Sequence, residues 1–502
     1  MNIGAALRKQ AAILGQKTAI TVNDASVDFA ALNRMTDRFA LQLKDCGIEK
    51  GDIVAVTLPN SLEFVVAYFA VLRLGAVFMG LDPRQTQEEL RAIFMDAHPK
   101  ALVVDDRTRM KGLEEEFDVK VLPLAVGSAF LWPLDGHASL RLEDVETKEE
   151  DPAVLLYTSA STGKPKGVLL PRRSLEVFPE FCEALFGNHL SSQVFGVSIP
   201  MCHIGGPIYC NALAARGISL VIVEPFRPDR FLLAVQKHGV TGFHSVPPIL
   251  MALLQAQLKM RLDLKSLFWV APMGMSVPVS LMEALDQAFP GTRIFQGYGL
   301  TETAGGIVFV PPADAEFRKS SMGKIMVSGC TIEAQGPEGE SLPAGKVGEI
   351  AVAGKCLMLG YLNRPELNAK VFRNGFFLTG DLGYQDEEGF FYHLGRKDDV
   401  INVGGEKVYP SEIEQALYSN PSVKEACVLG VDDPKKGKSI KAFVCPAPGQ
   451  TLEKRELMNF LKDRLASYKI PQEFVFLDAL PKTAVGKVAK DTLRKFVLGQ
   501  TL

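Results

Sequence analysis

The hydrophobic positions of the first 150 residues alternate between helical and strand spacing. Residues 61–76 (SLEFVVAYFAVLRLGA) predict a helix that ends at Gly75, and residues 76–83 (AVFMGLDP) predict a buried strand. Residues 86–97 (TQEELRAIFMDA) predict a second helix with a capping box, and residues 100–106 (KALVVDD) predict another strand. Helices that alternate with strands indicate an α/β domain with a mostly parallel sheet.

The same alternation returns over residues 190–310, whereas residues 320–395 have short apolar runs and frequent turns. That second pattern predicts a small β-rich subdomain. From Arg396 onward the pattern is strand–helix–strand–strand–helix, so we place a domain boundary at residues 396–399. The predicted fold is α/β, with a large N-terminal domain of mostly parallel sheets and helices (1–395) and a smaller α+β C-terminal domain (396–502).

Composition and charge narrow the classes of function. The chain has 502 residues and a net charge of −3, which gives no electrostatic reason to expect a nucleic-acid partner. The stretch from Arg396 onward is net basic and the remainder is net acidic. An anionic ligand shared between the two parts would explain this asymmetry, and so would random variation of surface residues.

Cysteines and apolar runs predict the compartment. The eight cysteines form no Cys-x-x-Cys pair and no Cys/His cluster at metal-ligand spacing, which is typical of small core residues in a reducing environment. Residues 1–16 carry charge too early for a signal peptide. The longest apolar region, residues 64–81, is interrupted by Arg73, as in a core helix followed by a strand. We expect a cytoplasmic enzyme without a transmembrane segment.

Residues 157–168 (YTSASTGKPKGV) concentrate hydroxyls, lysines and glycines between two apolar runs. The flanking runs predict strands, so the segment predicts a tight hairpin loop. Hydroxyls, lysines and backbone N–H groups in such a loop suit phosphate oxygens, although an ordinary polar hairpin has the same composition. The segment is not a Walker A loop, because Pro165 follows Gly163-Lys164 where Ser or Thr is required.

Two further segments suit a nucleotide. Residues 296–304 (QGYGLTETA) follow a predicted strand and offer a ring for stacking on a base and a carboxylate for Mg²⁺. Residues 375–384 (GFFLTGDLGY) place Asp381 in a glycine-flanked turn that suits a ribose diol.

Two cations complete this set. Arg396 lies in residues 394–410 (LGRKDDVINVGGEKVYP), and Lys487 lies in residues 480–494 (LPKTAVGKVAKDTLR). Taken singly, each of the four segments also fits a turn, a surface charge or a capping residue.

Together and in this order, the five motifs resemble the adenylate-forming superfamily of acyl- and aryl-CoA synthetases, peptide-synthetase adenylation domains and luciferases. The resemblance runs from residue 58 to residue 494. It implies a loop that closes over the β- and γ-phosphates of ATP, formed by Thr158, Ser159, Ser161, Thr162, Gly163 and Lys166.

The resemblance also assigns the remaining roles at the nucleotide. Thr158 and Glu302 would hold Mg²⁺, Tyr298 would stack on adenine beside Thr301, Asp381 would bind the ribose hydroxyls with Arg396, and Lys487 would bridge the substrate carboxylate and the α-phosphate.

A mobile C-terminal domain is a further implication of the resemblance. In the superfamily this domain rotates between acyl-adenylate formation and thiol transfer, about a hinge that maps to Asp398. Five residues of this domain are candidates to meet CoA, although a solvated charged turn explains the lysines equally well: Gly404, Gly405, Lys435, Lys436 and Lys438.

The acyl site follows from residues 199–207 (IPMCHIGGP). His203 falls where the superfamily has its gating residue, and Ile204 falls where amino-acid-activating members carry an aspartate for the substrate ammonium. A buried ammonium without a partner is costly, so we expect an acid that lacks an α-amine. The mostly apolar pocket candidates suit a fatty or aromatic acid: His203, Ile204, Gly205, His244, Met273, Gly274 and Met275.

Two positions depart from the superfamily pattern. Ala160 replaces a glycine of the phosphate loop, and residues 273–276 (MGMS) stand where Gly-Gly-Ala-Pro is usual. The second departure affects the pocket, because two methionines would narrow or bend it.

The leading hypothesis is an acyl-CoA ligase that uses ATP, Mg²⁺ and CoA. An enzyme that loads the acid onto a carrier-protein phosphopantetheine is the second, and a nucleotide-binding homologue that has lost catalysis is the third. The intact Glu302, Asp381, Arg396 and Lys487 argue against the third. The expected partners are small molecules and not nucleic acid, and a homodimer is compatible with this assignment.

Overall fold

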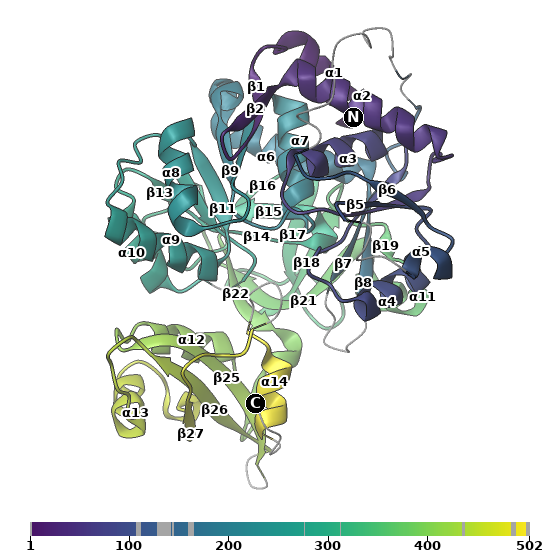
Figure 1. Cartoon of the computed structure of the whole chain (residues 1–502). Helices are drawn as coiled ribbons and strands as arrows, with labels where there is room; N and C mark the ends of the chain where they lie inside the picture. Colours follow the sequence, from purple (N-terminus) through teal and green to yellow (C-terminus); the bar gives the residue numbers. More distant parts are fainter. Residues whose placement is uncertain are drawn as a thin grey trace.

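The computed structural model describes residues 3–106, 112–127, 142, 145–158, 165–275, 277–311, 313–433, 437–482 and 488–497. Most of these residues form a large body of stacked sheets and helices, and the C-terminal residues form a smaller part at one end of it (Figure 1).

Two seven-stranded sheets lie at the centre of the large body. The first contains β3 (Ile53–Thr57), β4 (Val77–Gly80), β5 (Ala101–Val104), β6 (Lys120–Pro123), β7 (Pro152–Thr158), β8 (Lys166–Pro171) and β19 (Gly360–Tyr361), in the order β19-β8-β7-β4-β3-β5-β6. The second contains β1 (Thr18–Val22), β2 (Ala25–Asp28), β9 (Val194–Val197), β10 (Ser219–Ile222), β11 (Gly242–Ser245), β12 (Trp269–Pro272) and β13 (Arg293–Ile294), in the order β13-β12-β11-β9-β10-β1-β2.

Both sheets are mostly parallel. The neighbours from β7 to β6 in the first sheet and from β13 to β1 in the second run parallel, while β8, β19 and β2 are antiparallel. The prediction of an α/β fold with mostly parallel sheets is confirmed.

The helices of the large body are α1 (Ile3–Ile13), α2 (Phe29–Asp45), α3 (Leu62–Arg73), α4 (Gln87–Ala97), α5 (Leu113–Glu116), α6 (Val177–Phe186), α7 (Gly205–Arg216), α8 (Pro228–His238), α9 (Pro247–Met260), α10 (Val279–Ala288) and α11 (Pro365–Val371).

Local sequence signals set the ends of the helices. The hydroxyl of Ser61 accepts a hydrogen bond from the backbone N–H of Phe64 at 3.1 Å and caps α3. Thr86 and Glu89 form the predicted capping box at the start of α4. Helix α3 is buried along its whole length and shares one hydrophobic cluster with both sheets and α7.

A β-rich region follows the second sheet, as the turn-rich sequence predicts. It contains the three strands β14 (Gly297–Leu300), β15 (Gly305–Phe309) and β16 (Ile325–Met326), and a five-stranded sheet of β17 (Cys330–Gln335), β18 (Gly348–Gly354), β20 (Phe372–Arg373), β21 (Phe376–Gln385) and β22 (Phe391–Arg396).

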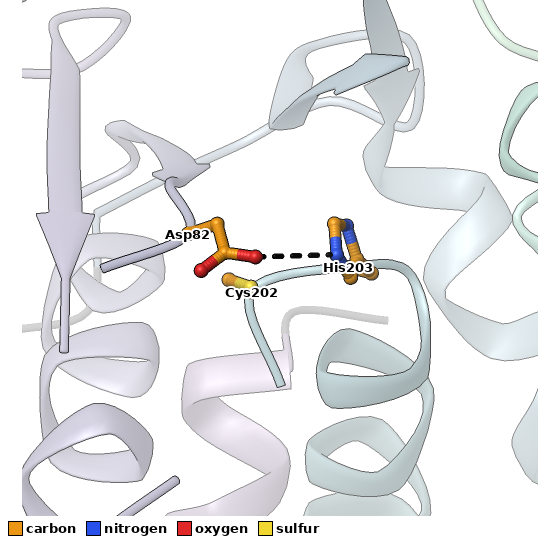
Figure 2. A group of neighbouring side chains, drawn as sticks. All are labelled: Asp82, Cys202 and His203. Carbon is orange, nitrogen blue, oxygen red and sulfur yellow. Dashed lines mark ion pairs between the residues drawn. The ribbon is translucent and has the colours of Figure 1, made fainter. Parts of the chain in front are cut away.

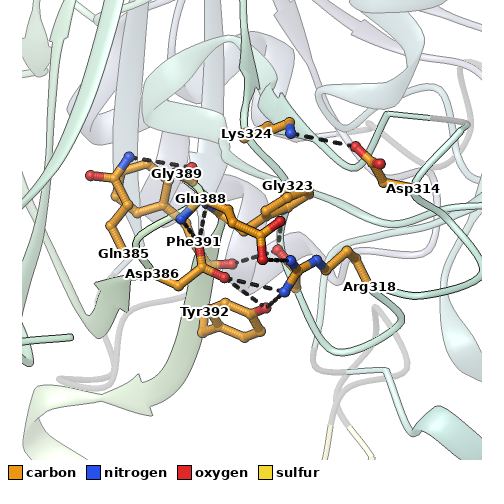
Figure 3. Close-up of polar contacts among 12 residues, drawn as sticks. Asp314, Arg318, Gly323, Lys324, Gln385, Asp386, Glu388, Gly389, Phe391 and Tyr392 are labelled. Atoms are coloured by element: carbon orange, nitrogen blue, oxygen red, sulfur yellow. Dashed lines mark hydrogen bonds and ion pairs between the residues drawn. The ribbon is translucent and has the colours of Figure 1, made fainter. Parts of the chain in front are cut away.

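Polar contacts fix the turn between β21 and β22 against the segment that follows β15 (Figure 3). Arg318 forms ion pairs with Asp386, at 3.3 Å, and with Glu388, and it donates a hydrogen bond to the Tyr392 hydroxyl at 3.2 Å. Gly323 forms a β-bridge with Phe391. The β21–β22 hairpin is therefore held at its turn, which leaves its open end as the exit toward the C-terminal part.

The C-terminal part has its own sheet and its own hydrophobic clusters. Its contacts with the large body include hydrogen bonds between Gln415 and the backbone of Val277 and Val279. The division at residues 396–399 remains a proposal. The elements are β23 (Ile401–Val403), β24 (Glu406–Val408), β25 (Val423–Asp433), β26 (Gly437–Pro446), β27 (Glu473–Phe476), α12 (Pro410–Tyr418), α13 (Lys454–Lys462) and α14 (Lys490–Val497).

None of the helices in the described ranges is both long enough and apolar enough to cross a membrane. The apolar region at residues 64–81 is the core helix α3 followed by the strand β4, as predicted.

Arg73, which interrupts that apolar region, is fully buried at the end of α3. Its Nη1 lies 2.6 Å from Asp37 Oδ1, and its Nη2 donates to Asn33 Oδ1 at 2.9 Å and to Gly4 O at 3.1 Å. One guanidinium therefore joins α1, α2 and α3. This arrangement compensates the cost of burying the charge.

We expect Asp37→Ala to lower the free energy of unfolding by about 3–5 kcal/mol, because it leaves the buried Arg73 charge without its carboxylate. The measurement is urea unfolding followed by tryptophan fluorescence, which reports on the large body because Trp132 and Trp269 are the two tryptophans of the chain. Glu183→Ala removes the exposed pair with Arg216 and should cost less than about 1 kcal/mol. Equal losses in the two variants would contradict the role of Arg73.

Candidate active site

The ends of β7 and β8 that flank the predicted phosphate loop lie beside Tyr361 of β19. Thr158 and Lys166 are paired residues at the loop end of the β7–β8 hairpin, which confirms the two predicted strands. The Nζ of Lys166 lies 4.9 Å from the centre of the Tyr361 ring. Residues 159–164 of the loop, with the predicted Ser159, Ser161, Thr162 and Gly163, lie outside the described residues.

Tyr361 connects this hairpin to Glu302. Its hydroxyl donates a hydrogen bond to Glu302 Oε1 at 2.8 Å, and the backbone N–H of Met358 donates to Glu302 O at 2.9 Å. Burial and the negative charge of Glu302 raise the pKa of Tyr361, so the hydroxyl stays a donor. Thr158, Lys166 and Glu302 therefore belong to one polar cluster, with Thr301 preceding Glu302 in a short 3₁₀ turn.

A second cluster surrounds the buried Asp381 on β21. Its Oδ2 accepts a hydrogen bond from the Tyr298 hydroxyl at 2.7 Å, and its Oδ1 lies 3.0 Å from Arg396 Nη1 and 3.4 Å from His393 Nε2. Burial alone would raise the pKa of Asp381, but the hydrogen bond from His393 and the charges of His393 and Arg396 outweigh it and hold the pKa below its usual value. Asp381 is an anion held by an arginine, a histidine and a phenol.

Arg396 crosses this cluster from the neighbouring strand β22. Its guanidinium also donates to Thr379 O at 3.0 Å, while 53% of the side chain stays exposed. Glycine suits position 380 for two reasons: a Cβ there would lie 2.9 Å from Arg396 Nη2, and the backbone has φ +73°. The structure places the Tyr298 hydroxyl on Asp381, and stacking of its ring on adenine remains a prediction.

The acyl-pocket candidates come from the start of α7 and the ends of two central strands. A Cβ on Gly205 would lie 2.1 Å from Ile199 Cδ1 and 3.5 Å from His244 Nε2, so backbone and imidazole approach closely. Met273 Cε lies within 2.9 Å of the Cβ position of Gly306. The structure thus brings Gly205 beside His244, and Met273 beside the β14–β15 hairpin, and Gly274 and Met275 follow Met273 in the chain.

His244 is a buried, neutral member of this group. Its ring stacks on Tyr209 at 4.5 Å between ring centres, and its Nδ1 has no hydrogen-bond partner in the described parts of the chain. Burial lowers the pKa of His244 to about 3. The side chain therefore carries no charge at neutral pH and suits an uncharged neighbour.

The predicted hinge lies between an ion pair with the large body on one side and ion pairs with the C-terminal part on the other. Lys397 Nζ lies 2.9 Å from Glu349 Oε2 in the large body, and Asp399 lies 2.7 Å from both Lys490 and Arg494 on α14. Asp398 stands between them, exposed, in a 3₁₀ turn of Lys397–Asp399. Its side chain makes no hydrogen bond or ion pair within the described ranges.

The remaining candidates belong to the C-terminal part. Gly404 and Gly405 form the exposed turn between β23 and β24, and both have positive φ angles. Lys438 lies on β26 and pairs with Asp432 at 2.7 Å. The predicted Lys435, Lys436 and Lys487 lie outside the described residues.

Sequence reasoning missed Tyr361 and His393. Neither stands in a motif with a recognisable spacing. Tyr361 reaches Glu302 from 59 residues along the chain, whereas His393 reaches Asp381 from the adjacent strand β22 of the same hairpin.

Comparisons with known proteins identify the family. The sequence profile of AMP-binding enzymes matches residues 7–362, and that of the AMP-binding enzyme C-terminal domain matches residues 412–487. The chain belongs to the AMP-binding enzyme family. The predicted membership of the adenylate-forming superfamily is confirmed.

Two similar relatives are CoA ligases. The chain is 32% identical to an indoleacetate–CoA ligase of Aromatoleum aromaticum, over 100% of this chain and 99% of the relative. It is 31% identical to a long-chain-fatty-acid–CoA ligase of Bacillus subtilis, over 97% of this chain and 93% of the relative.

A solved structure agrees with this picture. The o-succinylbenzoate CoA synthetase of Bacillus subtilis, in complex with an acyl-adenylate intermediate, superposes with a TM-score of 0.85 at 31% identity, over 97% of both chains. The same protein has been solved with ATP and a magnesium ion, with a TM-score of 0.84 to this chain over 97% of this chain and 99% of that one.

We expect Asp381→Asn to lower the free energy of unfolding at neutral pH by about 2 kcal/mol, because it removes an anion that is paired with Arg396 and His393. The pKa of Asp381 is lowered in the folded state, so this stabilisation is complete above the unfolded pKa of about 4 and fades as the pH falls below it.

The measurement is the difference in urea unfolding between the two proteins at pH about 7 and at pH about 3. Asp263→Asn, at an exposed pair with Lys265, is the control and should show no such change. A difference that grows toward low pH would contradict the assignment.

Proposed function

We propose that this protein is an AMP-forming acid–thiol ligase, which activates a carboxylic acid as acyl-AMP with release of pyrophosphate and then transfers the acyl group to CoA. The observation that carries the proposal is the pairing of two clusters at one end of the large body. One holds Thr158, Lys166 and Glu302 about Tyr361, and the other holds Asp381 and Arg396. Relatives that form acyl-CoA from indoleacetate and from long-chain fatty acids support the reaction class.

Glu302 and Thr158 would hold Mg²⁺ in this proposal. A carboxylate and a hydroxyl are the oxygen ligands that Mg²⁺ takes beside phosphates, so the residues present fit the ion. When bound, the ion supplies positive charge to the phosphate oxygens. The Tyr361 hydroxyl keeps the Glu302 carboxylate in place, and Lys166 adds a cation beside it.

Adenylation requires the attack of one anion on another, because the acid is a carboxylate and the α-phosphate is charged. Lys487 would sit between the two and offset their repulsion as the bond forms, which is where a fixed cation lowers a barrier most. Asp381 and Arg396 would hold the ribose and keep the α-phosphate in line with the attacking oxygen.

The acid would be uncharged apart from its carboxylate. Ile204 stands at the motif position where amino-acid-activating members carry an aspartate, and the candidate pocket residue His244 is neutral. Burying an unpaired ammonium there would cost more free energy than the apolar contacts of the substrate contribute. This supports a fatty or aromatic acid, in agreement with the substrates in the relatives' names.

Thioester formation would follow a rotation at Asp398. The exposed ion pairs on either side anchor Lys397 to the large body and Asp399 to the C-terminal part, so a change of dihedral angles at one residue reorients the two. Rotation would remove Lys487 and bring Gly404, Gly405 and the lysines near Lys438 toward CoA.

The experiment that tests the function measures ATP-dependent pyrophosphate release by the purified chain with a panel of fatty, aromatic and amino acids, followed by thioester analysis with CoA and with a phosphopantetheinylated carrier protein. We expect release with a fatty or aromatic acid and a thioester with CoA. Pyrophosphate release with one amino acid would overturn the proposed class of acid. Thioester formation with the carrier protein alone would show that the carrier, and not CoA, is the acceptor.

We expect Asp398→Pro to slow one half-reaction at least about tenfold more than the other, because proline fixes φ and restricts the preceding residue. Adenylation is measured by pyrophosphate exchange, and transfer is measured from preformed acyl-adenylate and CoA. Equal slowing of both would contradict a hinge at this residue.

Two variants serve as references for that experiment. Asp398→Ala keeps the backbone free and should leave both half-reactions close to wild type. Lys487→Ala should slow adenylation by about 10²–10³ while sparing transfer, since the lysine would act on the first transition state alone.

A further inference from the structure

Three side chains with metal-binding atoms meet next to the candidate acyl-pocket residues Ile204 and Gly205. The ligand atoms of Asp82, Cys202 and His203 all lie within 4.8 Å of one another. Figure 2 shows Asp82 and His203 facing each other with Cys202 beside them, and the distance from Asp82 Oδ2 to His203 Nε2 is 4.0 Å. Among the described residues, this is the one group of three or more such side chains.

The backbone around the group is held in place. Asp82 follows β4, and a Cβ on Gly80 at the end of that strand would lie 2.6 Å from Cys202 O, so glycine allows the two segments to approach. Asn60 fixes the other segment, since its side chain donates to Ile199 O at 2.9 Å and accepts from the N–H of Met201 at 2.7 Å. The three side chains therefore project from anchored segments.

We propose that Asp82, Cys202 and His203 form a site for a thiophilic divalent cation of the zinc class. Ligand bonds of about 2.0–2.3 Å require ligand atoms roughly 3.5 Å apart in a tetrahedral site, so the present spacing needs only small side-chain rotations. Sulfur and imidazole ligands favour Zn²⁺ over Mg²⁺. The ion expected here therefore differs from the Mg²⁺ expected at Glu302. Three protein ligands leave a fourth position for water.

Arg84 is the built-in competitor of the ion. Its backbone N–H and Nε donate to Asp82 Oδ1, each at 2.9 Å, and its Nη2 donates to Oδ2 at 2.6 Å. The arginine side chain is 60% exposed, so Nη2 can move into water when the ion takes Oδ2. The bonds to Oδ1 can remain and orient the carboxylate, as outer partners do at metal sites.

The site controls the acyl pocket in this proposal. His203 adjoins Ile204 and Gly205, so an ion that fixes its ring also fixes the entrance through which the acid would pass. The Cys202 thiol gives up its proton when the ion binds, and that proton leaves to water. Zinc-class ions are therefore inhibitors that act through the His203 ring.

The first experiment measures metal binding by the chelator-treated protein without acid or nucleotide, with Zn²⁺ in competition with a chromophoric chelator and with Co²⁺ by its thiolate charge-transfer absorption. We expect one equivalent to bind to wild type, and Cys202→Ser, His203→Gln and Asp82→Asn each to weaken binding at least about tenfold. Cys46→Ser and His189→Gln remove a cysteine and a histidine elsewhere and should bind as wild type does.

Arg84→Gln should tighten metal binding, because it removes the cation that competes for Asp82. A gain in affinity cannot result from misfolding, so this variant controls for it. Binding of equal strength in wild type and Cys202→Ser would overturn the proposal, and so would the absence of a bound equivalent in wild type. These outcomes do not depend on the proposed ligase activity.

The second experiment adds buffered Zn²⁺ to the pyrophosphate assay. Cys202→Ser should keep the wild-type rate when chelator is present, and it should need at least about tenfold more Zn²⁺ for half inhibition. Inhibition that is equal in both proteins would place the inhibitory ion elsewhere and would contradict control of the pocket.

Discussion

The burial of one carboxylate, Asp381, is the constraint on which the arrangement of the site depends. An anion removed from water needs compensation, and here His393 and Arg396 supply it from β22 and Tyr298 supplies it from the neighbouring β14–β15 hairpin. Meeting this need fixes β14 against the β21–β22 hairpin. Because β22 ends at Arg396, the same electrostatic requirement fixes the point at which the chain leaves the large body.

Immediately after Arg396 the polar contacts of the chain become more exposed to solvent. The pair that Lys397 makes with Glu349 in the large body has an exposed lysine, so it contributes little and can be exchanged for water. Arg73, in contrast, is fully buried and holds three helices together. The large body therefore combines a rigid interior with a weakly held connection, which is the arrangement that a rotating C-terminal part requires.

The acyl side of the site depends on close packing as much as on charge. Gly80 and Gly205 let backbone segments approach the loop at residues 199–203 to distances that a side chain would prevent. His244 is kept neutral by the same packing. The candidate acyl-pocket residues and the Cys–His–Asp group consequently share the loop at residues 199–205.

The sequence by itself determined those features that are written in local order: the helical period of α3, the capping box of Thr86 and Glu89, the hairpin of Thr158 and Lys166, and the motifs around Glu302 and Asp381. The family followed from the order of these motifs. Only the tertiary structure decided which side chains meet them. Tyr361 reaches Glu302, His393 reaches Asp381, and Asp82 reaches Cys202 and His203, although the spacing of the cysteines predicted no Cys/His cluster. Hydrophobic period specifies which face of a strand is buried, but not which strand becomes its neighbour, and these contacts depend on the strand order.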